Sequence, residues 1–157
     1  MNYTKRIQSI VDQYREAGQP WPAEKRAIAA WAVRTRAWEP QPSMLINQCA
    51  DEIARAMREE YFTDPQGRRV RAKYAAKFLQ EGKQVTLWGD LRSENRPFLA
   101  TAFQQRRQQI LGECNQLKTD VDSYNQNRNS GEPIQIVFDF ALDLAEMEAV
   151  KSLKLAG

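Results

Sequence analysis

One repeat of side chains, between residues 99 and 124, constrains this 157-residue chain more than any other feature. Its members recur every three or four residues, and they are Leu99, Phe103, Arg106, Ile110, Cys114, Leu117, Val121 and Tyr124. This spacing is close to a heptad seam, so it predicts a long helix over residues 93–127 that packs lengthwise on another helix. At roughly 1.5 Å per residue the helix would be about 50 Å long, which is longer than a small domain needs.

Three shorter helices are predicted before this long one. Residues 4–17 carry an apolar stripe at helical spacing, made by Ile7, Ile10, Val11 and Tyr14. A second helix is predicted from Pro22 to the proline-rich break at residues 38–42, because proline suits the first turn of a helix and disrupts its interior. A third helix is predicted over residues 43–61, with Ser43 as its N-cap.

The period of the pattern changes to two after residue 61. Residues 64–67 have the composition of a turn, and cationic and apolar residues then alternate over residues 69–74. A second turn at residues 80–83 leads into the β-prone segment 84–88. These segments predict a small antiparallel β-ribbon.

The last part of the chain predicts a linker, a strand and a helix. Residues 125–133 are polar and contain Gly and Pro, residues 134–140 alternate as in a short strand, and an acidic amphipathic helix follows over residues 141–153 with Asp139 as its N-cap. The predicted fold class is mainly α, of the α+β type. Residues 1–90 would form a helical module with the β-ribbon, residues 91–128 a long helical arm, and residues 129–157 the linker and the acidic strand-helix tail.

The composition excludes much of catalytic chemistry. The chain has no histidine, so Ser-His-Asp triads and His-ligated metals are excluded. Cys49 and Cys114 form no CxxC pair and indicate a reducing compartment. The sequence has neither the apolar core of a signal peptide nor an apolar run long enough for a membrane span, so it predicts a cytoplasmic protein. Neither a P-loop nor a GxGxxG motif is present, so we expect no catalytic residues, no metal and no cofactor. A metal-dependent nuclease built from Glu113, Asp120 and distant acids is the enzymatic alternative.

Positive charge is concentrated in one short segment. Residues 68–77 hold five cations and no acid, namely Arg68, Arg69, Arg71, Lys73 and Lys77. Residues 132–157 carry a net charge of −3 within a chain of net charge +3, so the rest of the chain carries +6. Cations that alternate along a strand lie about 7 Å apart, which is comparable to the spacing of phosphates along a nucleic acid. The alternative interpretation is a solvated strand face whose charges prevent aggregation.

The order of the predicted elements, three helices and then a basic hairpin, resembles a winged helix-turn-helix module. This resemblance implies that the helix over residues 43–61 lies in the major groove of DNA, while Asp64 to Arg68 form the tip of the wing beside the phosphates. The helix would present Asn47, Gln48, Arg55 and Arg58. Arg residues would supply affinity, and Asn or Gln could recognise base edges.

Two hypotheses for the function follow. The first is non-catalytic binding of nucleic acid, most simply double-stranded DNA, in a bacterial or phage regulatory or genome-handling role. The second is a protein–protein adaptor, or a subunit of a larger complex, that uses the long helix and the acidic tail. In either case the apolar members of the seam could join two copies in a homodimer, and Arg106 would then need a carboxylate partner, which the acidic tail could supply.

Overall fold

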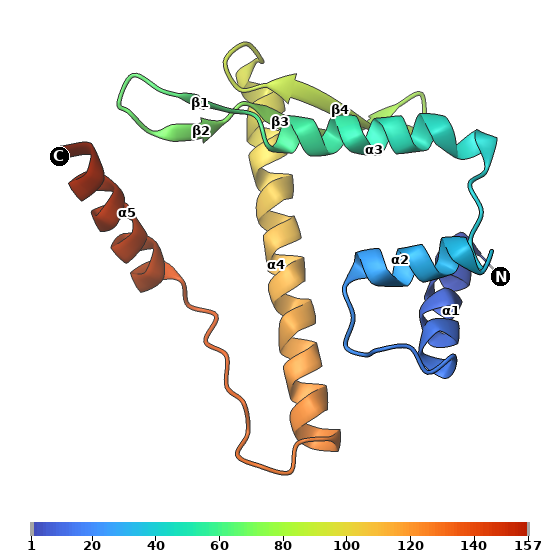
Figure 1. Cartoon of the computed structure of the whole chain (residues 1–157). Coiled ribbons are helices and arrows are strands. Elements are labelled where there is room, and N and C mark those ends of the chain that lie inside the picture. Colours follow the sequence, from blue (N-terminus) through green and yellow to red (C-terminus); the bar gives the residue numbers. More distant parts are fainter. Residues whose placement is uncertain (1, 157) are drawn as a thin grey trace. The chain divides into compact units, whose positions relative to one another are not determined.

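The computed structural model describes residues 2–156, and it mixes helices with two small antiparallel hairpins, which confirms the α+β class (Figure 1). The chain divides after Glu52 into two compact units. No helix within residues 2–156 combines the length and the apolar character needed to cross a lipid bilayer.

The first unit is built on helices α1 (Tyr3–Glu16) and α2 (Lys25–Arg34), which pack on each other. The Asn2 side chain caps α1 by accepting the Lys5 N–H at 2.9 Å. Tyr14 is buried between the helices, with its ring edge-on to Trp31 at 5.7 Å. The first predicted helix is thus confirmed, whereas the second begins at Lys25 instead of Pro22.

Helix α3 (Leu45–Arg58) follows a 3-10 turn, η1 (Pro42–Met44), and confirms the third predicted helix. It ends at Arg58, three residues before the predicted end at residue 61, because Tyr61 already belongs to a strand. None of the α3 side chains is buried, and Leu45 and Ile46 are 67% and 82% exposed. A winged helix-turn-helix module is therefore not established by this fold, since such a module buries the apolar face of its third helix.

The sheet structure in the second unit consists of two hairpins. Strand β1 (Tyr61–Thr63) pairs with β2 (Arg69–Arg71), and β3 (Lys73–Gln80) pairs with β4 (Lys83–Asp90). The predicted continuous strand over residues 69–74 is broken at Ala72, which is fully buried. Its N–H donates to the Glu60 carbonyl at 2.9 Å, and its carbonyl accepts the Leu91 N–H at 2.8 Å. These bonds connect the hairpins and replace a continuous ladder.

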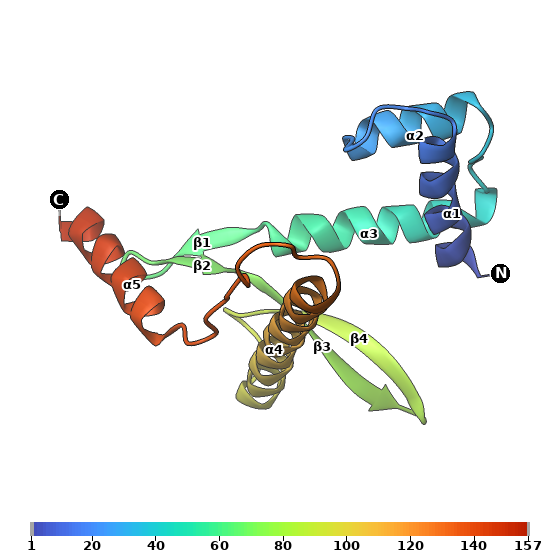
Figure 2. The ribbon, with the colours of Figure 1, turned by 90° about the horizontal axis from the view of Figure 1, so that it is seen from below.

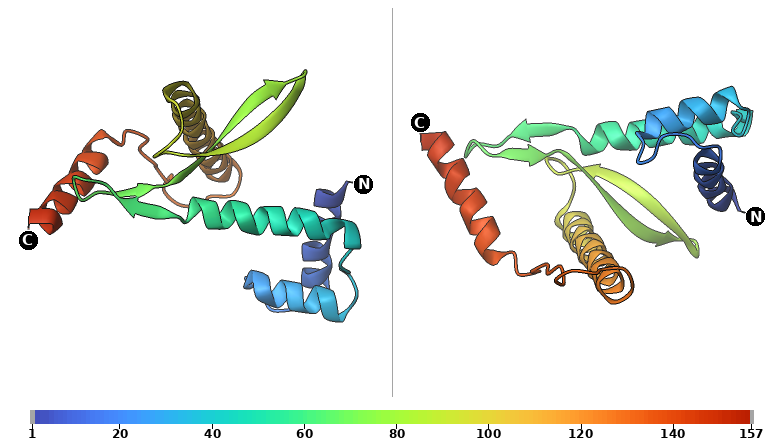
Figure 3. Two further views of the ribbon diagram at one scale, coloured as in Figure 1. Left: turned by 90° about the horizontal axis from the view of Figure 1, so that it is seen from above. Right: turned by 60° about the horizontal axis from the view of Figure 1, so that its bottom comes forward.

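Helix α4 (Arg96–Asn127) confirms the predicted long helix and has 32 residues. Asn95 caps it by accepting the Phe98 N–H at 2.9 Å. The β3–β4 hairpin packs against its first turns (Figures 2 and 3). In this contact Phe78 stacks on Phe98, and Tyr74 meets Phe103 edge-on. The predicted lengthwise packing of α4 on another helix is not found within the described residues.

The tail differs from its prediction in one element. Helix α5 (Ala141–Ala156) forms as expected, and the Asp139 carboxylate accepts the Ala141 N–H at 3.2 Å. The predicted strand over residues 134–140 does not form, because this segment pairs with no strand among the described residues. Instead, the Asn125 side chain donates to the Ile134 carbonyl and accepts the Ile134 N–H, at 2.8 and 3.0 Å.

Candidate nucleic-acid interface

A basic groove of about 230 Å³ lies in the second unit, where the end of α3, strands β2 to β4 and helix α4 come together. We call it the basic groove, and its lining residues are Arg58, Arg71, Lys73, Tyr74, Ala75, Thr86, Trp88, Arg106 and Gln109. Four of these are cationic, two are aromatic and none is acidic. The groove thus combines positive charge with flat apolar surface.

Besides the aromatic contacts, one polar side chain attaches α4 to the hairpin. The Gln105 amide accepts the Lys77 N–H at 2.7 Å and donates to the Lys77 carbonyl at 2.9 Å. These are the backbone bonds that a third strand would otherwise make on the open edge of β3. Arg106 and Gln109 follow on α4, so the same attachment brings them to the groove.

Lys73 is not available to neutralise a bound anion, because it already has acidic partners. Its Nζ lies 2.6 Å from Glu60 and 2.7 Å from Asp90, and Arg92 lies 2.8 Å from the same Asp90 carboxylate. Hydrogen bonds to Asp90 and then Glu60 raise the pKa of Lys73. Hydrogen bonds from Arg92 and then Lys73 hold the pKa of Asp90 well below its usual range. Lys73 therefore has a structural role at the junction of the two hairpins.

Three arginines of the groove have no such partner. Within the described side chains, residues 2–154, no carboxylate lies within 4.0 Å of the guanidinium of Arg58, Arg71 or Arg106. Among the described side chains, Arg106 donates to the Gln109 amide oxygen, at 3.3 Å, and Arg71 lies 5.8 Å from the centre of the Tyr74 ring. The predicted carboxylate partner of Arg106 from the acidic tail is thus not found among these residues. Planar guanidinium groups bind phosphate oxygens in bidentate fashion, so three together favour a polyanion.

The other predicted binding residues lie outside the groove. Arg68 pairs with Asp64 at 2.7 Å, and Arg69 stacks 4.1 Å from the centre of the Tyr61 ring. Lys77 is exposed, and its backbone bonds to α4. The three other predicted residues on α3, Asn47, Gln48 and Arg55, are exposed, and the Gln48 amide donates to the Glu52 carboxylate at 3.3 Å. Of the nine predicted residues, the structure brings Arg58, Arg71 and Lys73 into one groove.

Sequence reasoning missed Trp88 and Arg106 as parts of this groove. A signal for Trp88 was present, because a two-residue turn at Glu81 and Gly82 pairs Gln80 with Lys83. Counting outward from that turn places Ala75 opposite Trp88 and Lys73 opposite Asp90. No comparable local signal identifies Arg106, whose helix reaches β3 only through tertiary packing.

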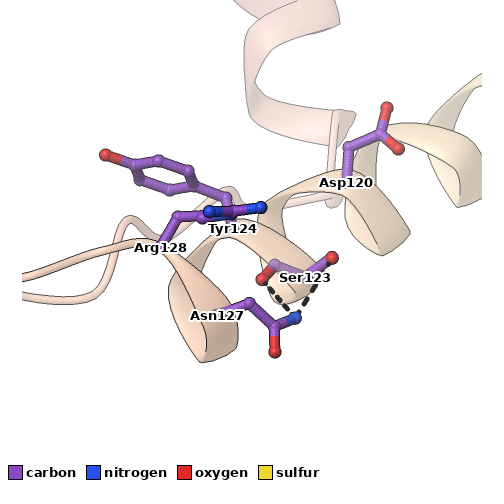
Figure 4. Close-up of a pocket in the computed structure, with 5 residues that line it drawn as sticks. All are labelled: Asp120, Ser123, Tyr124, Asn127 and Arg128. Atoms are coloured by element: carbon purple, nitrogen blue, oxygen red, sulfur yellow. Dashed lines mark hydrogen bonds between the residues drawn. The ribbon is translucent and has the colours of Figure 1, made fainter.

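The end of α4 carries a more open hollow, which Figure 4 shows. Its lining residues all come from the last turns of the helix and its cap, and they are Asp120, Ser123, Tyr124, Asn127 and Arg128. The Asn127 amide already donates to the Ser123 carbonyl at 2.9 Å. Within the described part of the chain, no three Cys, Asp or Glu side chains gather as metal ligands.

The acid dependence of stability tests the role of Asp90. Because the folded pKa of Asp90 is lowered, its ionised form stabilises the fold at pH values above about 4, and this contribution decreases as the pH falls below 4. We expect Asp90→Asn to lower the thermal midpoint at pH 7. The difference from the wild type should narrow between pH 4 and pH 2, as measured by circular dichroism. Asp122→Asn, which removes an exposed ion pair with Lys118, is the matched control and should have a smaller effect at pH 7. An equal effect would contradict the structural role of Asp90.

Comparison of the chain with models of protein families, with curated proteins and with solved structures gives no match.

Proposed function

We propose that this protein binds nucleic acid without catalysing a reaction, and that the basic groove holds phosphates of the backbone. The observation that carries the proposal is the presence of Arg58, Arg71 and Arg106 in one groove without carboxylate partners among the described side chains. Phosphate oxygens would supply the negative charge that these three groups lack. Trp88 and Tyr74 add flat surface against which sugars or bases can pack.

Duplex DNA is the proposed ligand. Support comes from the order of elements, since the β1–β2 hairpin follows α3 after two residues, and its tip is the turn from Asp64 to Arg68. On the winged helix-turn-helix template, the polar side chains of α3 would face bases in the major groove. Arg58, at the end of that helix, would then contact the phosphates beside it.

The test is a salt titration of binding by the full-length protein to a fluorescent duplex and to the matching single strand. We expect the triple variant Arg58→Gln, Arg71→Gln and Arg106→Gln to bind duplex DNA at least about tenfold more weakly, because hydrogen bonds to charged groups contribute about 1.5–3 kcal/mol each. The slope of log affinity against log salt should flatten by about 0.9 for each phosphate that the variant no longer binds.

The matched control removes three positive charges from exposed positions in the first unit, with Lys5→Gln, Arg26→Gln and Arg34→Gln. We expect this control to retain most of the salt dependence. Equal weakening in both variants would show a general effect of charge and contradict the groove as the site. Tighter binding to the single strand would contradict the assignment to duplex DNA. Failure of the wild-type protein to bind either DNA would contradict the proposed function and favour the adaptor hypothesis.

A further inference from the structure

An exposed apolar line runs along α4, and it meets the basic groove at Arg106, which belongs both to the seam and to the lining of the groove. Four side chains recur at intervals of seven residues, so they lie on one side of the helix. They are exposed to nearly the same extent, namely Phe103 46%, Ile110 44%, Leu117 46% and Tyr124 47%. Cys114 and Val121, which are half-buried, lie between the last three and complete an alternation of three and four residues. This pattern is typical of the seam between two paired helices.

The described parts of the second unit leave most of this seam open. The β3–β4 hairpin packs on the side of α4 that carries Phe98, Ala102 and Gln105, and it meets the start of the seam at Phe103 and Arg106. The segment over residues 133–138 approaches α4 only near its end, around Val121 and Asn125. The buried hydrophobic side chains of the described second unit are three alanines, Ala72, Ala76 and Ala102. So small a core predicts that further apolar surface is buried against another chain.

The charges along α4 favour one direction for a helix that packs on this seam. The first half of the helix, residues 96–111, contains Arg96, Arg106 and Arg107 and no acid. The second half, residues 112–127, contains Glu113, Asp120 and Asp122 and one lysine. A parallel copy would place like charges beside each other. An antiparallel copy places each positive half beside a negative half, which lowers the electrostatic energy and favours that orientation.

The positions of the seam residues along α4 also fit an antiparallel arrangement of two copies. When two antiparallel copies of α4 cross at the middle of the helix, the seam residues of one copy lie opposite those of the other. The pairs are Leu99 with Tyr124, Phe103 with Val121, Arg106 with Leu117, and Ile110 with Cys114. A two-fold axis through this point would therefore bring each member opposite another member of the seam, as an isologous dimer requires. We propose that two copies of this protein associate through antiparallel α4 helices, with the seam as their interface.

The first test is the molar mass of the full-length protein by light scattering after size-exclusion chromatography. The expected mass is twice the 18.2 kDa of one chain. The variant Ile110→Asp with Leu117→Asp would bury unpaired charge in the interface, so its mass should fall twofold while its helical signal remains. The matched control Gln108→Asp with Asn115→Asp makes the same charge change at exposed positions with the same spacing and should remain dimeric. A monomeric wild type, or a dimer that survives the seam variant, would overturn the proposal.

The second test determines the relative direction of the two helices with single cysteine substitutions, which place no charge in the seam. In a Cys49→Ser and Cys114→Ser background, chains with Leu117→Cys are mixed with chains carrying Arg106→Cys and treated with a short thiol cross-linker. Antiparallel helices place residue 117 beside residue 106 of the partner, so only the mixture should cross-link. Cross-linking of the Leu117→Cys chains alone would show a parallel pair and overturn the proposal. This test holds even where the double aspartate variant fails to fold. Its result is independent of DNA binding, so it separates failure of the dimer from failure of the proposed function.

Discussion

Gly89→Ala is expected to destabilise the second unit by about 1–3 kcal/mol, as overpacking of a filled site usually does. A Cβ atom at Gly89 would lie 2.5 Å from Cγ of Glu94 and 2.7 Å from Cε1 of Phe98. The Glu94 side chain is flexible and can move, but the Phe98 ring is stacked on Phe78. The added methyl group must therefore separate β4 from the first turns of α4. Chemical denaturation, followed by circular dichroism and by tryptophan fluorescence, to which Trp88 of this unit contributes, measures the change.

Gly112→Ala is the matched control, since it adds the same methyl group elsewhere in the same unit. Gly112 is in the middle of α4, and beyond the helix's own backbone no atom lies within 4 Å of the place that its Cβ would occupy. Alanine favours the helix over glycine by about 0.5–1 kcal/mol. The two substitutions should therefore change the free energy of unfolding in opposite directions. Equal stability of Gly89→Ala and the wild type would show that β4 and α4 are not closely packed.

Tyr14→Ala is expected to unfold the first unit, because it removes the largest buried side chain between α1 and α2. Truncation of a buried aromatic residue costs about 3–5 kcal/mol, which is a large part of the stability of so small a unit. Tyr14 is 3% exposed, and its hydroxyl donates to the Pro20 carbonyl at 3.0 Å. The measurement is tryptophan emission of the full-length protein, since three of its four tryptophans lie in residues 1–52. Their emission should shift to the red.

Tyr14→Phe separates packing from hydrogen bonding at this position. It keeps the ring against Trp31 and removes only the hydroxyl group, so we expect a loss of about 0.5–1.5 kcal/mol. The unit should remain folded. If Tyr14→Ala unfolds at the same midpoint as Tyr14→Phe, the ring does not hold the two helices together.

The features that the sequence determined by itself are those that depend on residues close together in the chain. Helices α1 and α4 follow from apolar residues spaced three and four apart. The β3–β4 turn follows from Glu81 and Gly82, which adopt φ values of 50° and 78°. Each of these signals lies within a short stretch of the chain, so it can be read from the sequence without any tertiary contact.

Only the tertiary structure decided which charges remain available for a ligand. The run of cations over residues 68–77 contains no acid, yet Asp64 pairs with Arg68, and Glu60 and Asp90 pair with Lys73. These acids are separated from their partners by four, 13 and 17 residues. Conversely, Arg106 belongs to the periodic seam in the sequence but lines the basic groove in the structure. The physical reason is that strand register and the attachment of α4 to β3 set the distances between charges, and no local pattern encodes them.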